Sequence, residues 1–267
     1  MVFFEFFGAR GGGEVRLIWA YRRIVQIGLA APPPRARKNE KPNSKIKYLL
    51  LFGDASYDPL DRITNNTNFV PSYQSNNSVS PTQSYVTDDY FGLLDDTEGN
   101  FVNDLVNIGI GRFPVQTLSE ANNMVDKVKN YNGKMAFGDW RNKVTFIADD
   151  GDDSDGNIHM QQSDNLCNII DDNYNNYNFD KLYLDIFNQE STPVGPRSEG
   201  CRDAINRRLN KGALIVNYFG HGGEDGLAHE FIYTKGLATG LKNKNRYTCI
   251  VTITCQFTKF DNPQRIT

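Results

Sequence analysis

One apolar run reads Ala213-Leu-Ile-Val-Asn-Tyr-Phe-Gly-His-Gly-Gly223 and ends in a histidine flanked by glycines. A second run reads Tyr247-Thr-Cys-Ile-Val-Thr-Ile-Thr-Cys255 and ends in a cysteine. Near-continuous apolar runs of this length are typical of strands that are buried on both faces of a parallel sheet. Binding and catalytic residues gather at the carboxyl ends of such strands. We therefore expect His221 and Cys255 to lie at functional strand ends.

The rest of the chain alternates between predicted strands and helices. A first series holds strands over 47–52 and 105–111, and a helix that begins at the capping box Thr117-Leu-Ser-Glu120. After a boundary at Trp140-Arg-Asn142, the pattern predicts strands over 143–148, 181–187, 213–219 and 247–254, and helices over 158–172 and 200–210. This alternation predicts an α/β fold with mostly parallel sheets.

The first 47 residues differ in net charge from the rest of the chain. The whole chain of 267 residues has a formal net charge of −3, which argues against nucleic acid as its main partner. Residues 1–47 nevertheless hold ten Lys and Arg against three Asp and Glu, together with a glycine run and a proline run. A targeting arm, a flexible linker and sequence outside the fold are the alternatives, and we favour the last two. We expect a poorly ordered segment over 1–45, a first lobe over 46–140 and a second, catalytic lobe over 141–267.

No stretch of the sequence predicts a transmembrane segment or a signal peptide. The apolar residues 2–7 are too few, and the stretch 17–31 is interrupted by Arg22 and Arg23, so neither reaches the roughly 20 residues of a membrane span.

His221 lies between glycines that allow a sharp turn and a close approach to a ligand. A backbone N–H beside it could donate to an oxyanion. The alternative is a structural histidine, held in a tight turn by an ordinary hydrogen bond. The residues alone favour neither of these two interpretations.

The four cysteines form no C-x-x-C pair, which argues against a structural zinc site. Cys249 lies inside a predicted strand and is expected to be a small buried hydrophobe. Cys255 lies where the strand ends, and a catalytic thiolate needs such partial exposure together with a cationic neighbour.

The stretch Asp149-Asp150-Gly151-Asp152-Asp153-Ser154-Asp155 is dense in carboxylates. An EF-hand is excluded, because its first and last ligands would fall on Gly151 and Gln162. A looser calcium site, a carboxylate that orients an imidazole, and a solvated acidic loop remain as alternatives.

Five blocks resemble the gingipain family of cysteine peptidases, peptidase family C25. These blocks are Leu49-Leu-Leu-Phe-Gly-Asp-Ala-Ser-Tyr-Asp58, Thr87-Asp-Asp-Tyr-Phe-Gly-Leu-Leu94, Ile108-Gly-Ile-Gly-Arg-Phe-Pro114, Val216-Asn-Tyr-Phe-Gly-His-Gly222 and Thr252-Ile-Thr-Cys255. The resemblance covers about residue 46 to the end of the chain. More narrowly, it points to the sortase-like members that serve the type IX secretion system of Bacteroidetes.

The resemblance implies a caspase-like fold in which two α/β lobes pack side by side. It assigns His221 as the catalytic histidine, Cys255 as the nucleophile and Asp150 as the acidic helper, with Asp149 as a neighbouring alternative. Backbone N–H groups of Gly222 and Cys255 would form the oxyanion hole. Family members continue beyond the position twelve residues after Cys255 where this sequence stops, so we expect an incomplete second lobe.

The implied activity is that of a cysteine endopeptidase that processes the C-terminal sorting domains of secreted proteins. The alternatives are a secreted Arg- or Lys-specific protease and an inactive module that binds calcium or a partner. The resemblance requires no cofactor, and it implies polypeptide substrates, contact with other secretion components, and a location at the outer membrane, on the cell surface or outside the cell.

Overall fold

The computed structural model describes residues 2–5, 46–74, 86–95, 98, 105–151 and 155–263. The chain forms two compact units: unit 1 consists of Met1–Gly8 and Val125–Thr258, and unit 2 of Ala9–Met124 and Lys259–Thr267. Most of the basic segment 1–45 lies outside the described residues, so its predicted disorder stays a prediction, as do the predicted lobes. No helix in the described ranges is both long and apolar enough to cross a membrane.

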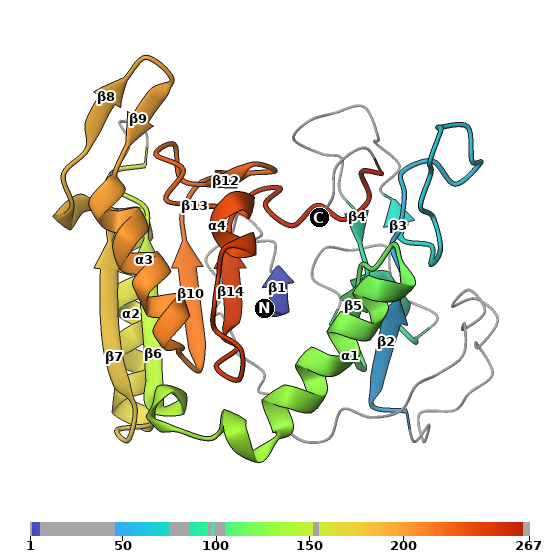
Figure 1. Ribbon diagram of the computed structural model, residues 1–267, viewed down its shortest axis with the longest axis horizontal. Helices are drawn as coiled ribbons and strands as arrows, with labels where there is room; N and C mark the ends of the chain where they lie inside the picture. The colour runs from blue at the N-terminus through green and yellow to red at the C-terminus, as the bar shows by residue number, and fades with distance from the viewer. Residues whose placement is uncertain are drawn as a thin grey trace. The chain divides into compact units, whose positions relative to one another are not determined.

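Unit 1 contains a parallel sheet of five strands (Figure 1). In spatial order, the strands are β1 (Val2–Glu5), β14 (Cys249–Ile253), β10 (Ile215–Phe219), β6 (Lys143–Ala148) and β7 (Asn178–Tyr183). Every neighbouring pair is parallel. The predicted α/β class with a parallel sheet is confirmed.

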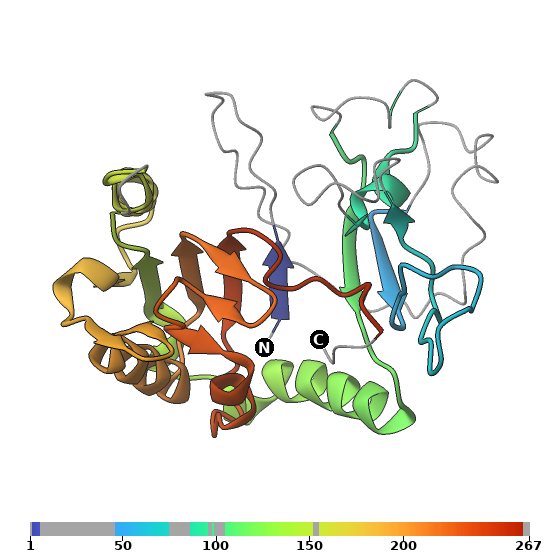
Figure 2. The same ribbon diagram turned by 90° about the horizontal axis from the view of Figure 1, so that it is seen from above.

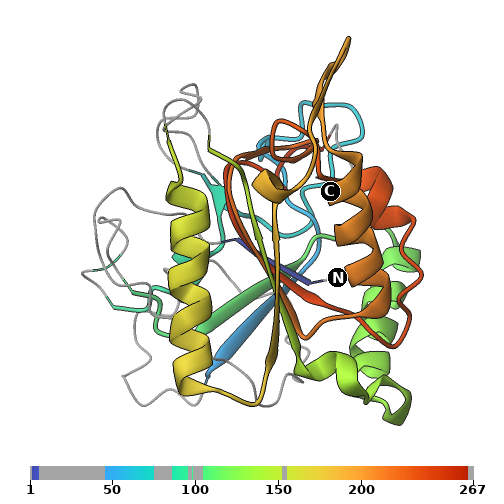
Figure 3. The same cartoon turned by 90° about the vertical axis from the view of Figure 1, so that its left-hand side faces the viewer.

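Helices cover both faces of this sheet. Figures 2 and 3 show α2 (Ile158–Asn173) on one face and α3 (Glu199–Lys211) on the other. Side chains along β6 alternate accordingly: Phe146 packs in the core that includes Cys167 of α2, whereas Ile147 packs in the core that includes Ile205 of α3. Burial on both faces explains why these strands are apolar almost throughout.

The predicted strand over 181–187 was placed too late in the sequence. β7 begins at Asn178 and ends at Tyr183, and a 3-10 helix, η5 (Leu184–Ile186), follows. β7 is the edge strand of the sheet, so it includes polar residues that mask a strand pattern.

Unit 2 contains a parallel pair, β2 (Tyr48–Phe52) and β5 (Gly109–Phe113). The second strand was predicted to begin at Leu105, but that side chain is 79% exposed and precedes the strand. The chain then enters α1 (Leu118–Asn132) through the predicted capping box, which is confirmed. The Glu120 N–H donates to Thr117 Oγ1 at 3.2 Å, and the Glu120 carboxylate accepts from the Thr117 N–H at 3.2 Å.

Arg112 of β5 ties together three of the sequence blocks that carry the family resemblance. Its side chain is only 4% exposed and forms two bonds with Asp88, at 2.7 and 2.8 Å. The guanidinium also donates to the carbonyl groups of Gly53 and Val70, at 2.8 and 2.9 Å. A lysine could not form these two parallel bonds to one carboxylate, so the contacts explain why the third block has an arginine at position 112.

The remaining elements are short. They are β3 (Tyr73–Gln74), β4 (Val86–Thr87), η2 (Asp89–Gly92), η3 (Lys134–Ala136), η4 (Asp139–Asn142), β8 (Glu190–Thr192), β9 (Gly195–Arg197), β11 (Gly222–Gly223), β12 (Gly226–Leu227), β13 (Tyr233–Thr234) and α4 (Lys235–Thr239).

Candidate active site

The carboxyl ends of β6, β10 and β14 lie next to one another in unit 1 and carry the predicted site residues. β10 pairs with β14 so that Phe219 faces Ile253, and the Gly220 N–H donates to the Ile253 carbonyl at 3.3 Å. His221 and Cys255 each lie two residues beyond this pair. Because neighbouring strands are about 4.8 Å apart, this register brings the two residues to corresponding positions at one sheet edge.

Two glycines let the histidine loop pack closely against Asp149 and against the cysteine segment. Gly220 has a φ of +156°, and a Cβ there would overlap Asp149 and the hydroxyl of Tyr218. A Cβ on Gly222 would overlap Thr254 Oγ1 and lie 3.4 Å from the Cys255 carbonyl oxygen. A side chain at position 220 would displace the loop from Asp149, and one at position 222 would displace it from the segment after β14, which explains the glycines on both sides of His221.

Asp149 holds the backbone of the histidine loop. Its side chain is 2% exposed, and its Oδ2 atom accepts the His221 N–H at 2.8 Å. The buried Tyr218 hydroxyl lies 3.3 Å from the same oxygen and donates to the His221 carbonyl at 2.6 Å. Burial raises the pKa of Asp149 to about 6; the His221 N–H lowers it, and the nearby Asp150 and Glu230 raise it.

Asp149→Asn is expected to remove a pH dependence of stability. With a folded-state pKa of about 6 against an ordinary 3.8, the folded protein binds this proton more tightly than the unfolded chain. The stabilisation from Asp149 is therefore complete below about pH 4 and is lost as the pH rises through about 6. Asparagine stays neutral and keeps an oxygen that accepts the His221 N–H.

Urea unfolding from pH 4 to pH 7 measures this effect. The free energy of unfolding of Asp149→Asn, relative to the natural protein, should increase with pH by up to about 3 kcal/mol. Asp171→Asn, at an exposed position of α2, is the control and should show no such slope. A relative stability of Asp149→Asn that is constant across this range would contradict the assignment.

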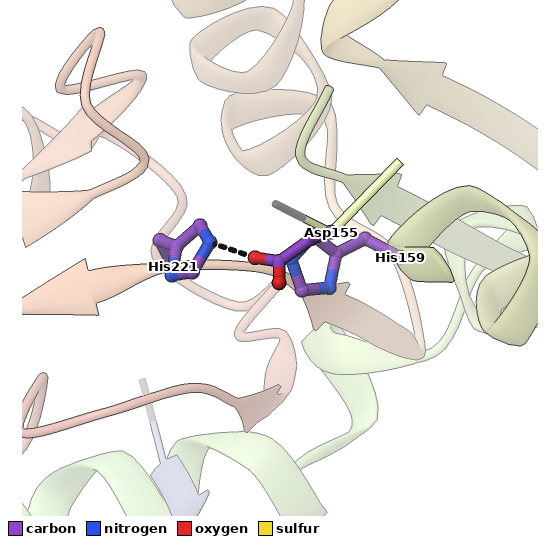
Figure 4. Close-up of side chains that lie close together, drawn as sticks. All are labelled: Asp155, His159 and His221. Atoms are coloured by element: carbon purple, nitrogen blue, oxygen red, sulfur yellow. Dashed lines mark hydrogen bonds and ion pairs between the residues drawn. The ribbon is translucent and has the colours of Figure 1, made fainter. Parts of the chain in front are cut away.

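The His221 side chain lies in a cluster with Asp155 and His159 (Figure 4), and His229 also contacts its ring. Its Nε2 atom is 2.7 Å from Asp155 Oδ2. The His159 ring meets it edge-on at 5.1 Å between ring centroids, and the His229 ring stacks on it at 5.4 Å. The carboxylate that contacts this imidazole is therefore Asp155, which lies at the end of the acidic loop.

Asp150, the predicted acidic helper, accepts a hydrogen bond from Gln189 Nε2 at 2.8 Å. It also forms a group of carboxylates with Asp149 and Glu230. Its role as helper stays a prediction. The neighbouring acidic residues 152–154 lie outside the described residues. The spacing of four between Asp155 and His159 fits one turn of a helix and could have indicated that these two side chains are neighbours, but the sequence carries no signal for the contact of Asp155 with His221.

Cys255 is exposed, whereas the other three cysteines are buried or partly buried, and all four are free. Burial raises the pKa of Cys249 to about 11 and that of Cys201 to about 12, and it also raises the pKa of Cys167. Burial thus disfavours the thiolate form of these three cysteines, and Cys255 is the cysteine whose side chain is exposed.

The Gly222 N–H, a predicted oxyanion donor, is directed away from the neighbouring strand β12. The Ala228 N–H donates to the His221 carbonyl at 2.9 Å, and Gly222 pairs with Leu227 in the antiparallel β11–β12 ladder. This pattern makes Gly222 and Leu227 a non-hydrogen-bonded pair, so the Gly222 N–H points away from β12. The second predicted donor, the Cys255 N–H, follows β14 by two residues.

The chain is similar to known proteins in sequence and in fold. Residues 35–267 match the sequence model of peptidase family C25. The crystal structure of the Arg-specific cysteine proteinase gingipain R (RgpB) is similar with a TM-score of 0.58 and 21% identity, over 83% of this chain and 44% of that chain. The complex of the Porphyromonas gingivalis RgpB pro- and mature domains gives 0.57 and 20%, over 83% and 45%.

A further solved structure, described as that of a protease, gives a TM-score of 0.51 and 22% identity, over 80% of this chain and 39% of that chain. No curated protein matches the sequence. The chain thus spans less than half the length of the solved proteins that it resembles, and the likeness to them is one of fold. Because the family model matches most of its length, the chain belongs to peptidase family C25, the gingipain-type cysteine peptidases.

Proposed function

We propose that this protein is a cysteine endopeptidase whose nucleophile is Cys255 and whose general acid and base is His221. The observation that carries the proposal is the common position of the two residues beyond β10 and β14, with Gly222 packed against the Cys255 carbonyl. The exposure of the Cys255 thiol supports the same assignment.

Hydrolysis then proceeds through an acyl-enzyme. The Cys255 thiolate attacks the carbonyl carbon of the scissile peptide bond, and protonated His221 gives its proton to the leaving amine. His221 next removes a proton from a water molecule, which attacks the thioester and releases the acid product. The N–H groups of Gly222 and Cys255 stabilise the oxyanion, and one such donor is worth about 3 kcal/mol.

The carboxylate that orients the imidazole is Asp155 in this proposal, with Asp150 as the alternative. Asp155 contacts Nε2, which leaves Nδ1 for the proton exchange with the thiol. Asp150 accepts a hydrogen bond from Gln189 Nε2 at 2.8 Å.

We propose as substrates the C-terminal sorting domains of exported proteins, cleaved at the cell surface with other secretion components as partners. One observation favours a second candidate, cleavage after Arg or Lys. Asp149, Asp150 and Glu230 form a carboxylate group close to His221, and a similar solved structure is that of an Arg-specific proteinase.

A cleavage assay separates these candidates. The purified protein is incubated with a peptide library that varies the residue before the scissile bond, and with a fusion protein that carries a C-terminal sorting domain. Cleavage of the fusion without a basic preference supports sorting-domain processing, and a strong preference for Arg or Lys supports the second candidate. Absence of cleavage of both substrates, together with an unreactive Cys255, would contradict the peptidase and favour a binding module.

A further inference from the structure

We propose that Asp155, His159 and His221 form a binding site for a divalent transition metal ion of the zinc class, and that the bound ion blocks the peptidase. The metal site is inferred from the positions of its three ligands and does not depend on the proposed function. The inhibitory effect rests on the proposed function, because it requires His221 to be catalytic.

The three ligand atoms already lie close together (Figure 4). Asp155 Oδ2 is 2.7 Å from His221 Nε2 and 3.8 Å from His159 Nε2, and ligand atoms of the three residues all lie within 4.8 Å of one another. Ligands of a tetrahedral zinc ion at about 2.1 Å are roughly 3.4 Å apart. Small side-chain rotations would therefore suffice to place all three around one ion.

The fold supports each of these ligands. Asp155 lies in the turn before α2 and His159 in the first turn of this helix, and their side chains already contact each other. The His221 backbone is held by Asp149 and by the Tyr218 hydroxyl. The three side chains are between 18% and 37% exposed, so an ion can enter from solvent and keep a water molecule as its fourth ligand.

The donor set selects the class of ion. Two imidazoles and one carboxylate suit zinc and its neighbours in the transition series, whereas calcium and magnesium require more oxygen ligands. An ion on Nε2 takes the place of the proton that this nitrogen carries in the imidazolium. Nδ1 then keeps the only ring proton, so His221 can no longer accept the proton of the Cys255 thiol.

Cobalt absorption spectroscopy and zinc calorimetry test the site in Cys255→Ala, a background that lacks the thiol. We expect one bound ion per protein, and His159→Gln should weaken its binding by at least about 10-fold through the loss of one of three ligands. His229→Gln is the matched control, since His229 stacks on the His221 ring but is not one of the three ligands, and it should bind the ion unchanged. Unchanged affinity in His159→Gln would overturn the proposal.

Activity assays test the inhibitory effect separately. Zinc should inhibit the natural protein reversibly, and a chelator should restore activity. His159→Gln should keep its basal activity and require at least about 10-fold more zinc for half inhibition. Equal zinc sensitivity of both proteins would show that the ion is held by the Cys255–His221 pair and would overturn the proposal. Metal binding without peptidase activity would instead contradict the proposed function and leave the site intact.

Circular dichroism of His159→Gln checks that this variant is folded like the natural protein.

Asp155→Asn provides a second binding test in the Cys255→Ala background, because it removes the only charged ligand while it keeps the size of the side chain. We expect cobalt binding to weaken there by at least about 10-fold as well, and unchanged binding would count against the site.

Discussion

Replacing Cys255 with alanine is expected to lower kcat/KM for peptide cleavage by at least about 10⁴-fold, because the acyl-enzyme cannot form without the thiolate. The folded structure should be retained, since the side chain is exposed at the end of β14 and makes no part of either buried cluster of unit 1. Initial cleavage rates measured at equal protein concentration give the result.

Cys249→Ala is the matched control for this experiment. Cys249 lies six residues earlier, within β14, and burial raises the pKa of its thiol to about 11. Its activity should stay within about threefold of the natural protein after correction for the folded fraction. Comparable losses in the two variants would show that Cys255 has no special role.

Replacing His221 with alanine is expected to lower kcat/KM by about 10³- to 10⁴-fold, because the thiol loses its base and the leaving amine loses its acid. The backbone bond from residue 221 to Asp149 does not involve the ring, so the loop should keep its position. Initial cleavage rates of the variant and of the natural protein, measured at equal protein concentration, give the result. An activity equal to that of the natural protein would remove His221 from the mechanism.

The same assay decides which carboxylate orients the ring. Asp155 contacts His221 Nε2 at 2.7 Å, whereas Asp150 accepts a bond from Gln189. If Asp155 is the helper, Asp155→Asn should lower kcat by about 100-fold through misplacement of the imidazole, and Asp150→Asn should have a small effect. The reverse order of effects would support Asp150, as the family resemblance implies.

The sequence predicted the sheet of unit 1 because its central strands are buried on both faces. The runs that form β6, β10 and β14 are apolar almost throughout. Where such runs alternate with predicted helices along a chain, a parallel sheet buried on both faces is the expected structure. The edge strand β7 has polar residues and was misplaced by three residues at its start. The pairs β8–β9 and β11–β12 have strands of two or three residues, which are too short to show a period.

The site was predicted to the extent that it follows from strand ends. His221 and Cys255 follow the carboxyl ends of neighbouring parallel strands, so the order of the sheet alone brings them together. The contact of His221 with Asp155 and His159 instead depends on how α2 packs on β6 and β10, and no pattern within the sequence reports that packing. The same applies to His229, which reaches the cluster from the loop between β12 and β13.

The most direct test of the central claim is the site of modification by a peptide probe that traps acyl-transfer cysteines. The protein is incubated with a peptidyl acyloxymethyl ketone, and mass spectrometry then locates the adduct among the four cysteines. The proposed mechanism predicts one adduct, on Cys255, which forms at least about 100-fold more slowly in His221→Ala. An adduct on another cysteine, or a rate that does not change in His221→Ala, would contradict a Cys255–His221 active site.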